Sequence, residues 1–291
     1  DELVRLRLGD VPAYQRARTL AVDWLLAYPM KNEAWANYFE DISFKPNIKN
    51  VANINPLEIA RYLIDRSAAE PSLRALVPPL LAYVERTFGN DAQNEKGTVK
   101  EPGVQWGAVT ISEQQDYRYK MGSHTSRYAS VMARWHEATG EAAAKEKAYR
   151  SFAWATYMCR EDGVVITGPN ERSVWFTDGY GDYVRHYMTG MGAVPAWAPP
   201  KEDHLLRSSS VVTAVTYAPG RISYRTFDDT GVEVLRLSFV PKVVRAGGKP
   251  LPTLTAWAEG AAGVFVEPLD GGDVVVRVRR GKARDVAIAA R

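Results

Sequence analysis

The sequence predicts an α+β protein in which antiparallel α-helical hairpins are followed by an antiparallel β-sandwich. From residue 12 to about residue 191, apolar residues recur every three or four positions, which is typical of amphipathic helices. From residue 208 they alternate with polar residues, which is typical of half-buried strands. The proline-containing segment 198–203 separates the two patterns. We therefore expect a helical domain at residues 1–200 and a β-sandwich domain at residues 201–291.

Six or seven helices are expected from this spacing. Pro12 stands at a first-turn position, and Thr177 or Asp178 is a suitable N-cap for the last helix. A polar loop at residues 89–103 interrupts the pattern. The predicted helices cover residues 12–28, 56–67, 71–88, 112–135, 141–160 and 178–191.

The C-terminal part is expected to hold short strands separated by turns rich in Gly, Asp and Pro. Basic residues alternate with valines in the last predicted strand and continue to Arg284. We interpret them as the solvated face of an edge strand, where Lys and Arg discourage pairing with other chains. The predicted strands cover residues 211–217, 221–225, 232–239, 263–266 and 274–278.

Composition excludes several classes of protein. The 37 Lys and Arg residues nearly balance the 34 Asp and Glu residues, so we expect no nucleic-acid partner. Cys159 is the only cysteine, which excludes an intrachain disulfide. No apolar run approaches the ~20 residues of a membrane span. Phosphate-binding loops, dinucleotide fingerprints and nucleophile elbows are absent, so we expect no cofactor.

The chain opens on Asp1-Glu2-Leu3 without a methionine. We expect either a removed leader or a longer parent protein. The compartment stays open, with a secreted or periplasmic location as one option, and so does the oligomeric state.

The segment from Trp175 to Tyr187 combines carboxylates, a histidine and aromatic rings around two glycines, as a sugar-binding groove requires. Asp178 and Asp182 lie four residues apart, on one helix face, and are candidates for an acid/base or sugar-gripping pair. Alternatively, Asp178 caps the helix and Asp182 binds a neighbouring side chain. His186, four residues after Asp182, is a candidate general base or a buried histidine bonded to a carbonyl. The rings expected to contact substrate here are Trp175, Tyr180 and Tyr183.

A second cluster follows Gly122, which we expect to interrupt a helix so that a new one starts at Ser123. His124 is then a candidate catalytic residue, and Arg127 and Tyr128 are candidate substrate-binding residues on the same side. The alternative is a solvated surface where Arg118 and Lys120 pair with Glu113 and Asp116.

A third group holds Trp35 and Tyr38, which are three residues apart and suit a stacking platform for a sugar. Asp41 and the asparagines after it offer oxygen ligands for calcium, but in no calcium-loop spacing. No His or Cys pattern suits zinc. We therefore expect no metal.

Helical hairpins followed by a β-sandwich resemble the six-hairpin (α/α toroid) glycosidases and polysaccharide lyases. The residues Val234-Leu235-Arg236-Leu237, Pro241 and Gly248-Lys249-Pro250-Leu251 are similar to the C-terminal β-domains of such proteins. A complete ring takes more helices than this chain provides, so the resemblance implies a partial toroid. The remaining helices would lie upstream, come from another chain or not exist.

The resemblance and the aromatic, carboxylate-rich segments together predict a carbohydrate-active enzyme. It would be a glycoside hydrolase or a polysaccharide lyase that acts on an oligo- or polysaccharide. In helical-toroid enzymes the substrate faces the N-terminal ends of inner helices, which implies such a position for His124 and Arg127. The alternative is a non-catalytic glycan-binding or scaffold protein.

Overall fold

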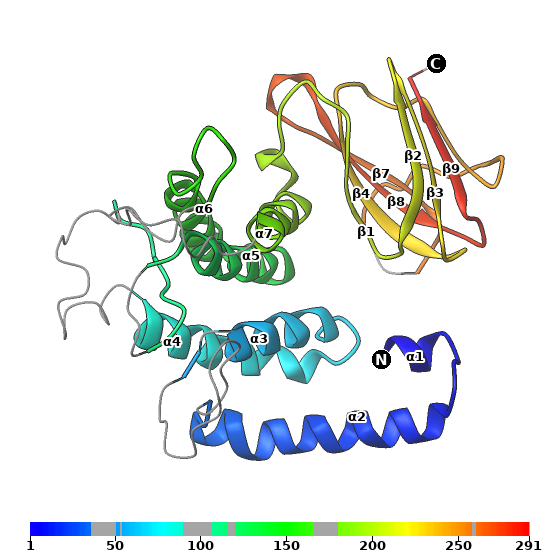
Figure 1. The fold of residues 1–291 in the computed structure, drawn as a ribbon. Coiled ribbons are helices and arrows are strands. Elements are labelled where there is room, and N and C mark those ends of the chain that lie inside the picture. Colours follow the sequence, from blue (N-terminus) through cyan, green and yellow to red (C-terminus); the bar gives the residue numbers. More distant parts are fainter. Residues whose placement is uncertain are drawn as a thin grey trace. The chain divides into compact units, whose positions relative to one another are not determined.

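The computed structural model describes residues 1–35, 51–52, 54–89, 106–115, 120–165, 180–257 and 260–290. The protein is α+β, because its helices precede two antiparallel sheets (Figure 1). The chain forms two compact units. The first contains Asp1–Tyr128 and Arg150–Asp178, and the second contains Ala129–Tyr149 and Gly179–Arg291. The domain boundary expected at residue 200 stays a prediction.

Local sequence explains where several helices begin. Asp10 caps α2, since its carboxylate accepts a bond of 3.0 Å from the backbone N–H of Ala13, and Pro12 occupies the first turn. The apolar face predicted for residues 56–67 is buried in α3, which packs against α4. The described helical segments are α1 (Glu2–Arg5), α2 (Val11–Leu25), η1 (Leu26–Met30), α3 (Ile54–Arg66), η2 (Pro71–Leu76), α4 (Val77–Phe88), α5 (Gly122–Thr139), α6 (Ala142–Thr156), α7 (Tyr180–Ala193) and η4 (Pro195–Trp197).

The helix expected from residue 112 is wrong at its start, because α5 begins at Gly122. Ser112 instead forms an antiparallel bridge with Lys120, and the N–H of Met121 donates to the carbonyl of Ile111 at 3.1 Å. In these pairings, backbone N–H and C=O groups bond across the chain, whereas in a continuous helix they would bond to groups four residues away. α5 therefore begins one residue before the start that was expected at Ser123.

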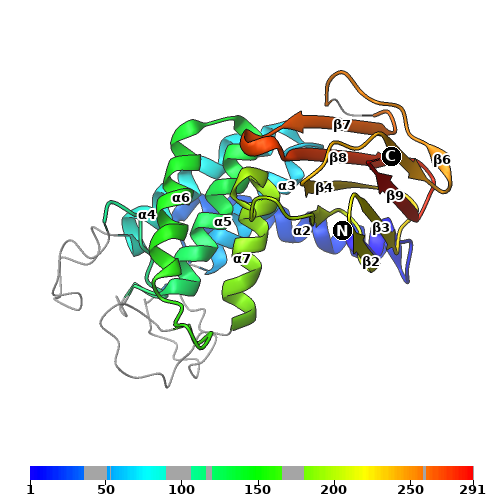
Figure 2. The same ribbon diagram turned by 90° about the horizontal axis from the view of Figure 1, so that it is seen from above.

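The strands of the second unit form two sheets (Figures 1 and 2). The four-stranded sheet has the order β1-β4-β8-β7, and the five-stranded sheet has the order β2-β3-β9-β5-β6. All pairs of neighbouring strands are antiparallel. The strands are β1 (His204–Ser208), β2 (Val212–Ala218), β3 (Arg221–Thr226), β4 (Gly231–Leu237), β5 (Val243–Ala246), β6 (Lys249–Pro250), β7 (Gly263–Pro268), β8 (Val274–Arg280) and β9 (Asp285–Ala289).

The core of this unit is formed by alternate residues of its strands. Ile222 and Tyr224 from β3 and Val286 and Ile288 from β9 point to one side of their sheet. They meet alternate residues of the other sheet, among them Leu235 of β4. Burial of such apolar side chains is the main stabilising contribution, at roughly 25 cal/mol for each Å² removed from water.

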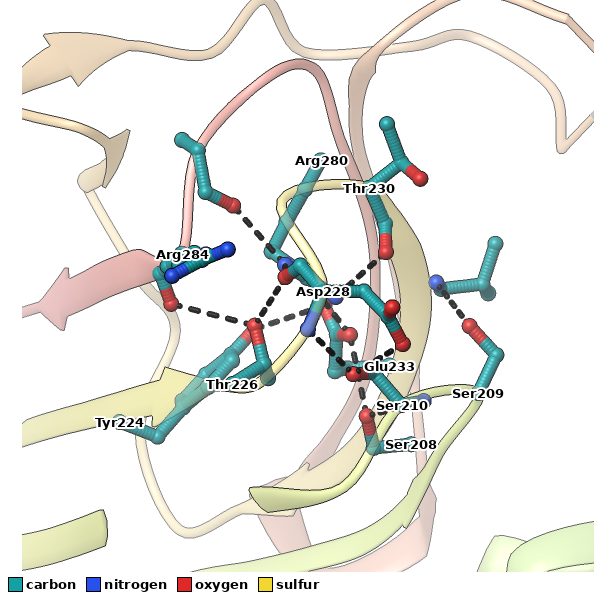
Figure 3. A network of polar contacts seen from close by, with 12 residues as sticks. Ser208, Ser209, Ser210, Tyr224, Thr226, Asp228, Thr230, Glu233, Arg280 and Arg284 are labelled. Carbon is teal, nitrogen blue, oxygen red and sulfur yellow. Dashed lines mark hydrogen bonds and ion pairs between the residues drawn. The ribbon is translucent and has the colours of Figure 1, made fainter. Parts of the chain in front are cut away.

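The edge-strand interpretation of the basic C-terminal residues is wrong. β8 lies between β4 and β7, and Arg280 is on the same face of β8 as the core residues Val276 and Val278. Its guanidinium forms a fully buried ion pair with Glu233, at 2.9 Å (Figure 3). A charge at this position is tolerated because its hydrogen bonds are satisfied inside the protein.

The network around this pair contains acceptors from two loops, between β3 and β4 and between β8 and β9. Arg280 donates to the carbonyl oxygens of Asp228, Ala283 and Thr230, each within 2.9 Å (Figure 3). The hydroxyl of Tyr224 donates to Glu233 at 3.2 Å. The network therefore fixes the loops at this end of the two sheets as well as the strands themselves.

The segment predicted as a linker is fastened to the four-stranded sheet. Arg236 of β4 forms a buried ion pair with Asp273, at 2.8 Å. It also donates to the carbonyl oxygens of Ala196 and Ala198. Asp273 accepts a bond from the backbone N–H of Lys201, which, despite the opposing effect of burial, lowers the pKa of this carboxyl below its usual value. Residues on both sides of Pro200 are therefore held by one buried ion pair.

Candidate functional site

The first turns of α5 carry buried polar side chains in place of apolar ones. Ser123, His124, Thr125, Ser126 and Arg127 are each at most 6% exposed. The Thr125 hydroxyl accepts a bond of 2.9 Å from the N–H of Ile111, and Ser126 donates to the carbonyl of Ser123 at 2.8 Å. The hydroxyls of Thr125 and Ser126 are therefore hydrogen-bonded to backbone groups. His124 and Arg127 are the two ionisable side chains among these five residues.

Lys120 adds a second buried cation, after Arg127, next to this start. Its ammonium donates to the carbonyl oxygens of Phe88 and Gly89, at 2.5 and 2.8 Å. These carbonyls end α4, where the helix dipole favours positive charge. The solvated surface considered for Lys120 is therefore wrong, because this side chain is buried and caps a helix.

Two glutamates from the preceding helices face α5 within the first unit. Glu58 of α3 lies 3.7 Å from the Nε of Arg127, and Glu85 of α4 accepts a 2.6 Å hydrogen bond from the Tyr128 hydroxyl. Burial, followed by the charge of Glu85, raises the pKa of Tyr128 well above its usual value. Tyr128 is therefore a protonated donor to Glu85, and its ring is fully buried.

A second polar group lies on α7, in the second unit. His186 is fully buried, and its Nδ1 lies 3.2 Å from the hydroxyl oxygen of Ser130. Tyr183 is also buried, and its hydroxyl lies 3.0 Å from that of Tyr187. The Ser130 contact fixes the orientation of the imidazole, as a general base or a structural histidine requires.

The candidate residues from the sequence thus fall into three groups. His124, Arg127 and Tyr128 lie in the first unit, and Tyr183 and His186 in the second. Tyr180 and Asp182 belong to α7, although the description of this helix does not extend to their side chains, so the Asp182–His186 hydrogen bond stays a prediction. The candidates Tyr38, Trp175 and Asp178, together with Asp41, lie outside the described residues.

Trp35 is buried in the first unit, where its ring centroid lies 6.5 Å from that of Tyr83. The ring packs in the interior, and a stacking role for it stays a prediction that requires it to become exposed.

Sequence reasoning missed Lys120, Glu58 and Glu85 as members of the helix-start cluster. Glu58 and Glu85 stand on helices that were predicted; Glu58 follows the buried Leu57 in α3, and Glu85 lies one turn from the buried Leu81 and Phe88 in α4. Their direction toward α5 depends on how α3 and α4 pack, and single-helix periodicity carries no information on it.

Among the described residues, no three His, Cys, Asp or Glu side chains gather closely enough to hold a metal ion. Within the same residues no helix is both long and apolar enough to cross a bilayer.

Comparisons with protein-family models, with curated proteins and with solved structures gave no match for this chain.

Proposed function

We propose that this chain is a carbohydrate-active enzyme, a glycoside hydrolase or polysaccharide lyase, whose helices form part of an α/α toroid. The observation that carries the proposal is the concentration of buried ionisable side chains at the start of α5, where His124 and Arg127 lie within one turn. Burying such groups costs free energy, and clusters of them are enriched at functional sites. The order of helices and antiparallel sheets also fits the architecture of these enzymes.

In this proposal His124 carries the proton and Arg127 binds the carboxylate of an acidic sugar. The first turn of a helix favours an anion, because its backbone N–H groups carry partial positive charge. Arg127 adds a full charge with the planar geometry that carboxylates match. Asp178 and Asp182 provide the acid/base pair of a hydrolase, His186 is the other proton carrier, and Trp175 and Tyr180 stack on sugar rings.

The test is a screen of uronic-acid and neutral polysaccharides with the wild-type chain, His124→Ala, His124→Gln and Asp182→Asn. A lyase gives an unsaturated product that absorbs in the ultraviolet, whereas a hydrolase gives reducing ends alone. Loss of a proton-transferring residue is expected to lower kcat by roughly a hundredfold or more, with retained binding. His136→Ala is the matched control, since His136 lies on the same helix, is partly exposed and faces the carbonyl of Glu141.

Circular dichroism of each variant separates lost chemistry from lost folding. The enzymatic proposal is wrong if folded His124→Gln and Asp182→Asn both keep wild-type kcat. It is also wrong if no glycan in the screen is turned over. Binding of a glycan by every variant without turnover would identify a glycan-binding protein instead.

A further inference from the structure

The outer face of the five-stranded sheet combines arginines with unusually small side chains. Along β3, Ile222, Tyr224 and Thr226 are buried, so Arg221, Ser223 and Arg225 point outward. Cross-strand partners share a face of a sheet. The register with β9 therefore pairs Arg221 with Ala289, Ser223 with Ala287 and Arg225 with Asp285 on this face.

The next strand brings a further arginine to the same face. Arg245 of β5 lies opposite Ala287, and Val243 lies opposite Ala289. β9 thus contributes two alanines between arginine-bearing strands on either side. Because alanine ends at Cβ and arginine is long, the middle strand forms the floor of a trough and the arginines form its walls.

Two hollows of about 800 and 380 Å³ occupy this trough. The larger is lined by Arg221, Val243 and Ala289, and the smaller by Ser223, Arg225 and Asp285. Arg245 and Ala287 line both. The hollows therefore form one continuous surface along the sheet, which we call the arginine trough, and Arg245 stands at its centre.

Positive charge dominates the arginine trough, with three arginines against one aspartate. Arg225 pairs with Asp285 at 3.1 Å, and both side chains are about 60% exposed, so this ion pair is weak. Arg245 donates to the carbonyl of Gly248 at 3.1 Å, which orients it and leaves its charge uncompensated. The charge complementary to this surface is negative.

The spacing of the arginines selects an extended ligand. Arg221 and Arg225 are separated by four residues of one strand, or roughly 13 Å, and β3 and β5 are two strand spacings apart, or roughly 10 Å. Arginines distributed along and across the strands in this way offer several separate positions for an anionic group. A ligand that carries several anionic groups along a chain uses them all.

The outward residues of the strands in this sheet also argue against nucleic acid. On β2 they are Ala214, Thr216 and Ala218, which pair with the outward residues of β3. No aromatic ring stands among them or among the outward residues of β3, β9 and β5, and single-stranded nucleic acids need rings on which bases stack. Planar guanidinium groups match carboxylates with two parallel hydrogen bonds.

We propose that the arginine trough binds a linear polysaccharide that bears carboxylate groups, with Arg221 and Arg245 as its principal contacts. The choice of a polysaccharide among polyanions rests on the proposed carbohydrate activity. The trough would hold a polymer on the second unit while another part of the same polymer is processed.

The test is affinity electrophoresis of the full chain through gels containing polygalacturonate, with a neutral glucan as the second gel. Wild type is compared with the double variant Arg221→Ser/Arg245→Ser and with Ala287→Glu, which places a negative charge on the floor. The control Arg16→Ser/Arg74→Ser removes the same charge from exposed helical positions. Both trough variants should raise the Kd for polygalacturonate at least roughly tenfold, and the control by less than about twofold.

Equal retardation of the trough variants and the control overturns the inference. So does stronger binding of polyglutamate or single-stranded DNA than of polygalacturonate. Turnover of short oligosaccharides separates this inference from the proposed function, because the trough variants should keep it and His124→Gln should lose it. If the chain binds polygalacturonate through these arginines but turns over no glycan, the inference about the arginine trough is supported and the proposed enzymatic function is contradicted.

Discussion

At the scale of single residues, the interior of the first unit contains hydrogen-bonded polar side chains as well as apolar ones. Tyr128 shows how such a side chain is accommodated. Its ring is fully buried, and its hydroxyl donates to Glu85, which is partly exposed. A carboxylate that accepts a short bond from a neutral donor forms a strong hydrogen bond, which offsets the cost of burying the hydroxyl.

We predict that Tyr128→Phe lowers the free energy of unfolding by about 2 kcal/mol, because Glu85 loses a charge-assisted bond while the ring volume is kept. Urea unfolding followed by circular dichroism measures the change. Tyr157→Phe is the control, since the Tyr157 side chain is 71% exposed and should change stability by less than about 0.5 kcal/mol. Equal losses in the two variants would show that the Glu85 bond contributes nothing.

At the scale of elements, alternation along a strand decides which charges are buried. β8 carries Arg277, Arg279 and Arg280 near its end. Arg277 and Arg279 share the outer face of their sheet, whereas Arg280 enters the interior and meets Glu233. Burial raises the pKa of Glu233, and the charge of Arg280 opposes this effect. The charge of each buried partner is therefore stabilised by the charge of the other.

We predict that Arg280→Met lowers the free energy of unfolding by about 3–5 kcal/mol, since it leaves the buried Glu233 without its counter-charge and three carbonyl groups without the guanidinium donor. The double variant Arg280→Met/Glu233→Leu should recover part of this loss. Arg225→Met breaks an exposed pair in the neighbouring sheet and should cost at most about 1 kcal/mol. Similar losses for Arg280→Met and Arg225→Met would contradict the buried network.

At the scale of the whole molecule, ion pairs between a helix and a strand link stability to pH. Arg207 of β1 donates to Glu137 of α5 within the second unit, at 2.8 and 2.5 Å. Burial alone would raise the pKa of Glu137, but Arg207, together with Arg134 and Arg277, outweighs it and lowers the pKa below its usual value. A depressed carboxyl pKa stabilises the folded state above the unfolded-state pKa, and this contribution is lost as pH falls through the folded-state pKa.

We therefore predict that Glu137→Gln lowers the free energy of unfolding at pH 7 by about 2 kcal/mol and that the difference from wild type shrinks below roughly pH 4.5. Urea unfolding at pH 7 and at pH 3.5 measures it. Glu161→Gln removes an exposed carboxylate and is expected to follow wild type at both values. A Glu137→Gln difference that stays constant with pH would show that this carboxyl is not the linked group.

Periodicity was sufficient for the elements whose burial is one-sided. The apolar stripe of α3 and the alternation of β3 are visible in the sequence, and both elements have the predicted type. It was insufficient for β1, whose residues are all partly buried, and for β9, whose outward alanines do not look polar. The same alanines form the floor of the arginine trough. Their small apolar side chains are therefore the reason that β9 was not predicted and also the reason that this face is hollow.

The candidate site divides in the same way. Residue types and spacing led to His124, Arg127 and His186, and each of them is buried beside polar groups. The partners Glu58, Glu85 and Ser130 come from other helices or helix segments, distant in sequence, and no spacing rule connects them.

The sequence by itself determined the α+β class and a change from helices to strands, expected at residue 208 and observed at His204, because side-chain period follows from backbone geometry alone. Tertiary structure decided that β8 is an inner strand, that Arg280 and Lys120 are buried, and that the arginines of β3 and β5 share one face. Those outcomes depend on strand order and helix packing, which bring together residues far apart in the chain, and a local pattern contains no record of its distant partners.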